Sequence, residues 1–435
     1  MTEFTVWAPS AGRVDLVVDS SVVAMDRSRR GWWSAEADAT TGSRYGYSLD
    51  GGPTRPDPRS RSQPDGVDGL SELIDPSFPW DDEAWRGFDL RGAVLYELHV
   101  GTFTPAGTFD GVVERLGHLT SLGVDAIEIM PVAEFSGSRG WGYDGVDLFA
   151  PHHAYGGPAG LKRLVDACHR SGIGVVLDVV YNHLGPAGNH LAEFGPYFSS
   201  AHQTPWGDAV NFDGPGSDEV RRFVIDNACA WLRDYHLDGL RLDAVHEIRD
   251  DAALHILESL ATEVDALQAE LGRPLVLIAE SDRNDPRYVR RPAAGGYGLD
   301  AVWADDWHHA LHTILTGETD GYYADFGSFE ALAKALRQGW VYDGIYSPHR
   351  QRRHGRSPAG LDGHQFVVCT QNHDQVGNRA LGDRPTTTLS AGQARVAAAL
   401  LLASPFTPML FQGEEWGTET PFQYFSSHED PALAA

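Results

Sequence analysis

The segment Gly239-Leu-Arg-Leu-Asp-Ala-Val-His246 is a short apolar run that ends in a cluster of polar side chains. Arg241 and Asp243 lie two positions apart, so a β-strand would direct both side chains to the same face. A charged group that emerges from a buried strand must meet a partner, water or a ligand, because an unpaired buried charge is very costly. The segment therefore predicts a buried strand whose C-terminal end carries a functional site.

The same pattern of apolar runs alternating with amphipathic stretches extends over most of the chain, which predicts a parallel sheet covered by helices. The predicted strands are residues 94–98, 126–130, 174–179, 239–242, 275–279, 301–303, 366–369 and 408–411. The predicted helices are residues 111–122, 160–171, 218–235, 250–271, 329–338 and 392–403. Eight such strands favour closure into an α/β barrel of the (β/α)8 type. A doubly wound open sheet is the alternative.

The first 50 residues show short strand patterns separated by turns and no helical pattern, which predicts a small N-terminal β-sandwich. Residues 51–79 are rich in proline and glycine and are expected to form an irregular linker. We therefore expect an N-terminal unit of residues 1–85, a glycan-binding-like sandwich plus linker, and a catalytic barrel over residues 86–435. Only about twenty residues follow Trp416, so we expect the C-terminal part to be truncated.

The bulk composition excludes several classes of function. The 435 residues carry a formal net charge of −27, which argues against nucleic acid or an anionic membrane as a partner. No run of apolar residues is long enough for a membrane helix, and the N-terminus has no signal-peptide pattern. The three cysteines lie far apart and predict neither a disulfide framework nor a metal site. A cytoplasmic protein with a neutral ligand, such as a sugar, fits these features, and the oligomeric state stays open.

Polar clusters follow several predicted strands at their C-terminal ends, where a barrel of this kind builds its active site. They are Asp178-Val-Val-Tyr-Asn-His183, the segment around Asp243, Ile278-Ala-Glu-Ser281 and Gln371-Asn-His-Asp374. A structural ion pair would explain one such cluster. Four clusters at one end of a barrel favour a site, with Asp243, Glu280 and Asp374 as its carboxylates.

Two of these carboxylates fit the two roles that cleavage of a glycosidic bond requires. Arg241 is expected to keep Asp243 ionised, as a residue that attacks or stabilises the anomeric carbon needs to be. Glu280 would instead need a raised pKa in order to protonate the departing oxygen near neutral pH. Asp374 is expected to orient sugar hydroxyls, and retention of configuration would require the first two carboxyl groups about 5 Å apart.

At these residues the chain resembles the α-amylase superfamily of glycoside hydrolases. The segments around Asp178, Asp243, Glu280 and Asp374 are similar to that family's conserved regions, in order and in strand placement. The resemblance implies that Asp243 is the nucleophile, Glu280 the acid/base and Asp374 the transition-state stabiliser. It further implies a substrate-binding set of Tyr143 beneath the sugar, His183 and His373 on its hydroxyls, Asp178, Arg241 and His246. His246 and Glu247 depart from the lysine and histidine that commonly stand there.

Further stretches are similar to those superfamily members that release trehalose from maltooligosyltrehalose. They are residues 55–67, 204–208, 211–213, 279–286, 371–379, 411–416 and 422–425. The resemblance implies hydrolysis of the α-1,4 bond next to the terminal trehalose. Trp206, Phe212 and His246 are candidates for the pocket that holds the leaving disaccharide. An α-1,4-glucan branching enzyme and a non-catalytic glycan-binding protein are the alternative functions.

Other features favour ordinary structural roles. Trp7, Trp32 and Trp33 could form a glycan platform, but in a small sandwich they are more often core residues. Asn182 aligns with a calcium ligand of some amylases, yet the sequence does not supply the six to eight oxygen ligands that calcium needs. A cluster at His308, His309 and His312 could hold a metal, but a solvent-exposed helix start explains it better. We therefore expect no metal and no cofactor.

Overall fold

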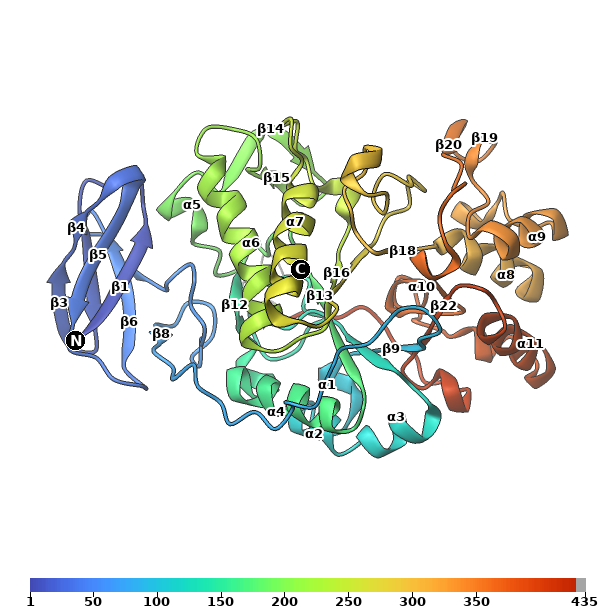
Figure 1. Ribbon diagram of the computed structural model, residues 1–435, viewed down its shortest axis with the longest axis horizontal. Helices are drawn as coiled ribbons and strands as arrows, with labels where there is room; N and C mark the ends of the chain where they lie inside the picture. Colours follow the sequence, from blue (N-terminus) through green and yellow to red (C-terminus); the bar gives the residue numbers. More distant parts are fainter. Residues whose placement is uncertain (428–435) are drawn as a thin grey trace.

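A closed barrel of eight parallel strands forms the centre of the computed structural model, which describes residues 1–427 (Figure 1). Its strands, in chain order, are β9 (Leu95–Leu98), β10 (Ala126–Ile129), β13 (Gly174–Val179), β16 (Gly239–Leu242), β17 (Val276–Ala279), β18 (Ala301–Trp303), β21 (Phe366–Cys369) and β22 (Thr407–Phe411). Strand β9 pairs with β10 on one side and with β22 on the other, which closes the ring. The predicted barrel is confirmed, and each strand agrees with its predicted range to within one residue.

Alternation along the barrel strands separates an inner from an outer set of side chains. Val176, Ile278 and Met409 pack together inside the barrel. Leu177 and Leu277 belong to the larger core outside it, which includes the covering helices. A polar residue that follows the inward-facing positions of a strand therefore points into the open end of the barrel, where the strands end.

Helices cover the outer face of the barrel (Figure 1). They are α2 (Phe109–Val113), α3 (Leu116–Leu122), α4 (Gly157–Arg170), α6 (Ser217–Asp234), α7 (Ile256–Leu271), α8 (Asp305–Thr316), α9 (Phe329–Gln338) and α11 (Ala391–Leu402). Short helices also occur in the connecting segments, namely α1 (Val100–Phe103), α5 (Leu191–Phe194) and α10 (His373–Gly377). The helix predicted over 111–122 is divided into α2 and α3. The helix predicted from residue 250 begins at Ile256. His255 is its N-cap, with a side chain that accepts from the Leu257 N–H, and Asp250 Oδ2 in the preceding loop accepts from the Ile256 N–H at 2.6 Å.

Helix α8 was not predicted as a helix of this length, and its histidines are not exposed. His308 and His312 are 2% and 8% exposed. Their rings stack at 5.3 Å, and the His312 ring stacks on Tyr323 at 4.6 Å. Burial lowers the pKa of His308 well below its ordinary value. The expectation of a solvent-exposed helix start is therefore wrong, because the rings of His308 and His312 are stacked and buried, and His312 Nε2 contacts Glu318 Oε2 at 2.8 Å.

The N-terminal β-structure consists of two antiparallel sheets, as expected. One sheet contains β1 (Thr2–Trp7), β5 (Trp32–Ala37) and β4 (Asp26–Arg27). The other contains β3 (Ser21–Ala24), β2 (Val14–Val18), β6 (Arg44–Leu49), β7 (Thr54–Arg55) and β8 (Ser71–Glu72). The last two strands lie in the segment expected to be irregular, so part of that linker completes the sheet. Trp7 and Trp33 are each 5% exposed and therefore belong to the core.

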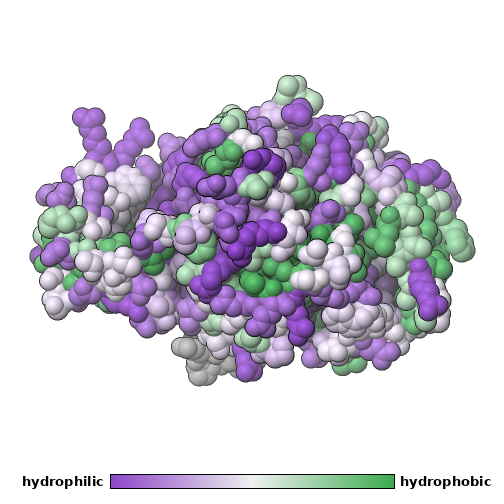
Figure 2. Space-filling model, turned by 60° about the horizontal axis from the view of Figure 1, so that its bottom comes forward, coloured by the Kyte–Doolittle hydropathy of each residue, from purple (hydrophilic) through white to green (hydrophobic). Residues whose placement is uncertain are grey.

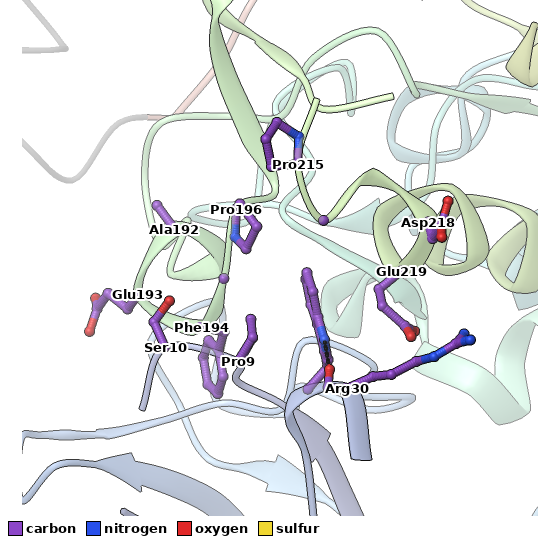
Figure 3. Close-up of a pocket in the computed structure, with 13 residues that line it drawn as sticks. Pro9, Ser10, Arg30, Ala192, Glu193, Phe194, Pro196, Pro215, Asp218 and Glu219 are labelled. Atoms are coloured by element: carbon purple, nitrogen blue, oxygen red, sulfur yellow. Dashed lines mark hydrogen bonds between the residues drawn. The ribbon is translucent and has the colours of Figure 1, made fainter. Parts of the chain in front are cut away.

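The two N-terminal sheets pack directly against the barrel domain. The Trp7 ring meets Tyr197 edge-on at 5.4 Å, and one continuous core contains residues of both parts. A groove of about 620 Å³ lies along this contact, lined by Trp7, Arg30, Glu193, Glu219 and neighbouring prolines (Figure 3). None of the predicted catalytic residues lines it, so the groove is separate from the site described below.

Three antiparallel hairpins interrupt the barrel pattern. They are β11 (Ala133–Glu134) with β12 (Asp147–Pro151), β14 (Phe198–Thr204) with β15 (Gly207–Val210), and β19 (Asp343–Ser347) with β20 (Arg352–Gly355). The β14–β15 hairpin follows strand β13 in the chain and rises beyond the strand ends (Figure 1).

The surface is hydrophilic over most of the face in Figure 2, with apolar residues gathered toward the end that carries α9 and α11. Val396 and Leu402 of α11 are about half exposed. Within residues 1–427 no helix has the length and apolar character needed to cross a membrane.

Candidate active site at the C-terminal ends of the barrel strands

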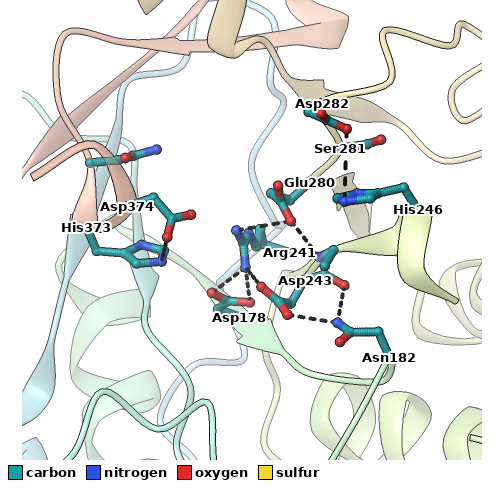
Figure 4. A network of polar contacts seen from close by, with 12 residues as sticks. Asp178, Asn182, Arg241, Asp243, His246, Glu280, Ser281, Asp282, His373 and Asp374 are labelled. Atoms are coloured by element: carbon teal, nitrogen blue, oxygen red, sulfur yellow. Dashed lines mark hydrogen bonds and ion pairs between the residues drawn. The ribbon is translucent and has the colours of Figure 1, made fainter. Parts of the chain in front are cut away.

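The predicted site residues converge at one end of the barrel (Figure 4). Asp178 lies near the end of β13, Asp243 directly after β16 and Glu280 directly after β17. Asp374 lies on the short helix α10, which follows β21. Each of these carboxylates comes from a different strand or its following loop, and closure of the barrel brings them to a common space.

Arg241 is the centre of the cluster. Its Nη1 donates to both oxygens of Asp178, at 2.9 and 2.8 Å, and to Oδ1 of Asp243 at 2.8 Å. Its Nη2 lies 3.8 Å from Oε2 of Glu280, and the guanidinium stacks on Trp303 at 4.2 Å. Burial opposes the positive charge, but the surrounding carboxylates, Asp178 first, raise the pKa of Arg241 well above its ordinary value. One buried cation therefore contacts three of the predicted site carboxylates.

Both oxygens of Asp243 are fixed by donors. Oδ1 accepts from Arg241, and Oδ2 accepts from Asn182 Nδ2 at 2.8 Å. The same amide also donates to the Asp243 carbonyl oxygen at 2.8 Å, while its Oδ1 contacts the His183 ring. Asn182, considered above as a possible calcium ligand, therefore holds the nucleophile candidate in place.

Glu280 has a different environment. Its Oε2 accepts from the Ala244 N–H at 2.6 Å. Burial raises the pKa of Glu280 well above its ordinary value, and although Arg241 lowers it, the charges of Asp243 and Asp374 add to the rise. A raised pKa favours the protonated form of this carboxyl group, which is the form that a general acid needs.

Tyr143, His373 and Asp374 form the opposite side of the site. The Tyr143 hydroxyl donates to Asp178 Oδ2 at 2.5 Å and lies 2.7 Å from His373 Nε2. The two rings stack at 5.2 Å. Asp374 Oδ1 is 3.5 Å from His373 Nε2, and the Asp374 side chain is 38% exposed. Asp374 is therefore ordered by a neighbour and still accessible to a ligand.

Two of the residues suggested for the leaving group, Trp206 and His246, lie at the rim of the site. The Trp206 ring, 51% exposed, stacks flat on His183 at 4.1 Å. His246 Nε2 lies 4.0 Å from Asp282 Oδ1, and burial lowers the pKa of His246. Phe212 is 1% exposed and packs in the core, so the expectation that it lines this pocket is wrong.

Two polar residues of this region, Arg350 and Glu97, were not predicted from the sequence. Arg350, in the turn of the β19–β20 hairpin, donates from Nη2 to Asp282 Oδ2 at 3.0 Å. Glu97, in the middle of β9, accepts from His373 Nδ1 at 2.5 Å. The sequence did contain a signal for Glu97, since it is a charged residue inside an apolar strand, but polar residues were sought only at the strand ends.

Comparison with known proteins places this geometry among established families. Residues 56–203 match the family model for the alpha amylase catalytic domain. A malto-oligosyltrehalose trehalohydrolase from Arthrobacter ramosus is 56% identical over 437 residues, which covers 99% of this chain and 76% of the relative. A crystal structure from Salmonella typhimurium, described as a candidate alpha amylase, superposes with a TM-score of 0.94 at 42% identity, covering 99% of this chain and 74% of that chain. A 1,4-alpha-glucan branching enzyme from Corynebacterium jeikeium is 28% identical and covers 95% of this chain and 60% of the relative.

Proposed function

The chain belongs to the malto-oligosyltrehalose trehalohydrolase family, and from that premise we propose how this glycoside hydrolase acts. Its reaction is hydrolysis of the α-1,4 bond next to the terminal trehalose of maltooligosyltrehalose, which releases trehalose. The observation that carries this function is the 56% identity to a trehalohydrolase over 99% of the chain. The two carboxyl groups of Asp243 and Glu280 both face Arg241, which supports a mechanism with two carboxyl groups, and we propose that it retains configuration.

In the first step, Asp243 attacks the anomeric carbon while Glu280 gives its proton to the glycosidic oxygen. The bond to the leaving trehalose breaks, and a covalent glycosyl–enzyme bond to Asp243 forms. The donors from Arg241 and Asn182 support this role, because they fix the attacking oxygens. The raised pKa of Glu280 supports its role as the acid, because it favours the protonated form that can give a proton to the leaving oxygen.

In the second step, the Glu280 carboxylate takes a proton from water as that water attacks the anomeric carbon. The bond to Asp243 breaks and the product keeps its original configuration. We assign Asp374 to the hydroxyls of the distorted sugar, Tyr143 to its face, and His183 and His373 to further hydroxyls. The exposure of Asp374 and the stacking of Tyr143 on His373 support these assignments.

The experiment that tests this function is incubation of the purified protein with maltooligosyltrehalose, with free trehalose and the anomeric form of the new reducing end measured. We expect trehalose and an α-configured product, and a Glu280→Gln variant that binds the substrate without cleaving it. A branched glucan as the main product would favour the branching reaction of the more distant relative. Binding without turnover by the unaltered protein would favour a glycan-binding protein, and a β-configured product would contradict retention.

We also propose a cellular compartment and a division into domains. The three cysteines are free and buried, which supports a reducing compartment such as the cytoplasm. The N-terminal sheets and linker, residues 1–85, form one unit, and the catalytic barrel begins after them.

A further inference from the structure

Glu97 is a buried carboxylate that the mechanism above does not use. It lies in the middle of β9, is 1% exposed, and stands beside Glu128 of β10 in the strand register. Both of its oxygens contact one residue, 276 positions away in the chain. Oε1 accepts from His373 Nδ1 at 2.5 Å, and Oε2 accepts from the His373 backbone N–H at 2.9 Å. Glu97 therefore fixes both the ring and the backbone of His373.

The hydrogen bonds around His373 define its protonation. The Tyr143 hydroxyl has one proton, which it donates to Asp178. His373 Nε2 must then be the donor in its 2.7 Å contact with the Tyr143 oxygen. Nδ1 faces the Glu97 carboxylate, an acceptor, and must donate as well. Both ring nitrogens carry protons, so His373 is an imidazolium.

We propose that Glu97 is a positioning residue of this active site, which orients His373 and keeps both of its ring nitrogens protonated. Through His373 it orders Tyr143, and through Tyr143 it reaches Asp178 and Arg241. The inference rests on the proposed function, because it assumes that His373 and Tyr143 contact the sugar being cleaved. Glu97 itself is too deeply buried to touch a substrate.

Charges from all sides of His373 act on it. The titratable and charged groups that face it are Glu97, His99, Glu128, Tyr143, Asp178, Arg241 and Asp374. Burial and Arg241 oppose its positive charge, but Asp374 and Glu97 raise the pKa of His373 to about 9. Removal of the Glu97 charge would therefore let His373 lose a proton at a lower pH.

Glu128 provides a matched control on the neighbouring strand. Both of its oxygens are buried without a hydrogen-bond partner among the described residues. Burial, followed by the charge of Glu97, raises the pKa of Glu128 well above its ordinary value. A raised pKa favours the neutral form of Glu128, so replacing it with glutamine is expected to change charge and volume little, whereas the same replacement of Glu97 removes a negative charge.

The test uses Glu280→Gln protein, which holds intact maltooligosyltrehalose, and compares its affinity with and without Glu97→Gln across the pH range. We expect the loss of affinity to be small near about pH 5.5, where His373 stays protonated in both proteins. The loss should grow to about tenfold near pH 8, where only the protein with Glu97 keeps the imidazolium. Glu128→Gln in the same background should cause no pH-dependent loss.

A loss of affinity that is the same at every pH would overturn the proposal, because a merely structural role predicts it. If Glu97→Gln does not fold, two other measurements test the proposal: the affinity of Glu97→Asp, and the pH titration of the His373 ring resonances by NMR. Glu97→Asp keeps the negative charge, so its affinity should depend on pH as that of the Glu280→Gln protein does. In the unaltered protein, a His373 ring that titrates below about pH 7 would overturn the proposal. Turnover by Glu280→Gln itself would contradict the proposed function instead, so the two failures are distinguishable.

Discussion

Arg241 shows how neighbouring acids acquire different chemistry from their surroundings. Asp243 receives two strong donors, whereas Glu280 receives one backbone N–H and lies farther from the guanidinium. Burial raises the pKa of Glu280 well above its ordinary value, which favours the acid form at this residue. The two-residue spacing of Arg241 and Asp243 predicted that they share a face of the strand, and the structure shows the contact between them. The sequence could not predict the role of Glu97, because its partner His373 lies at the start of α10, far along the chain.

Trp206 is the residue at which substrate choice can be tested. Its ring is half exposed and is held flat by His183, which makes it a preformed surface for a sugar. We expect Trp206→Ala to lower kcat/KM for maltooligosyltrehalose by about tenfold or more, and for plain maltooligosaccharides much less. Initial rates on both substrates measure this. Equal losses on both would mean that Trp206 does not contact the trehalose unit.

Elements buried on both faces were the ones that the sequence predicted well. The barrel strands are apolar runs whose pattern does not depend on distant partners. The hairpins β14–β15 and β19–β20 were missed, because they are largely polar and form only against the rest of the barrel. At α8 only a solvent-exposed helix start was expected, because its histidines resemble a polar surface, while in the structure the stacked rings of His308 and His312 are buried.

The backbone conformation of the loop before Tyr143 requires a glycine at one position. Gly142 has φ +97°, and a Cβ there would lie 2.1 Å from the Pro131 carbonyl oxygen. We expect Gly142→Ala to displace Tyr143 and to reduce kcat by about tenfold or more, because misplaced catalytic groups are costly. Gly123, with φ +85° at the end of α3 and open space around it, is the matched control.

Gly123→Ala carries a similar backbone strain, of about 1 kcal/mol, without a clash near the site. Both variants should therefore unfold at a lower temperature, and only Gly142→Ala should lose activity. Thermal unfolding and initial rates measure the two effects separately. Full activity of Gly142→Ala would show that the loop adapts without moving Tyr143.

At the scale of the whole molecule, the N-terminal sheets and the barrel share one core. The sequence separated them correctly by pattern, since strands without helices precede alternating strands and helices. It could not predict how closely they pack, because the contact joins residues such as Trp7 and Tyr197 that carry no local signal for each other. The division at residue 85 stays a prediction, since the core continues across it.

Trp7 is the residue through which this packing can be tested. It is 5% exposed, its Nε1 donates to the Arg30 carbonyl at 3.0 Å, and its ring packs against Tyr197. We expect Trp7→Ala to lower the free energy of unfolding by about 3–5 kcal/mol, because it leaves a cavity in the shared core. Trp416, 64% exposed, is the control, and Trp416→Ala should change stability by less than about 0.5 kcal/mol.

A shared core also predicts how the protein unfolds. With Trp7 present, far-UV circular dichroism and tryptophan fluorescence should report one common transition, because neither part can expose the contact without destabilising the other. In Trp7→Ala the N-terminal sheets should unfold at a lower temperature than the barrel, so that two transitions separate. Two transitions already present in the unaltered protein would show that the packing between the parts contributes little to stability, and that the N-terminal sheets fold on their own.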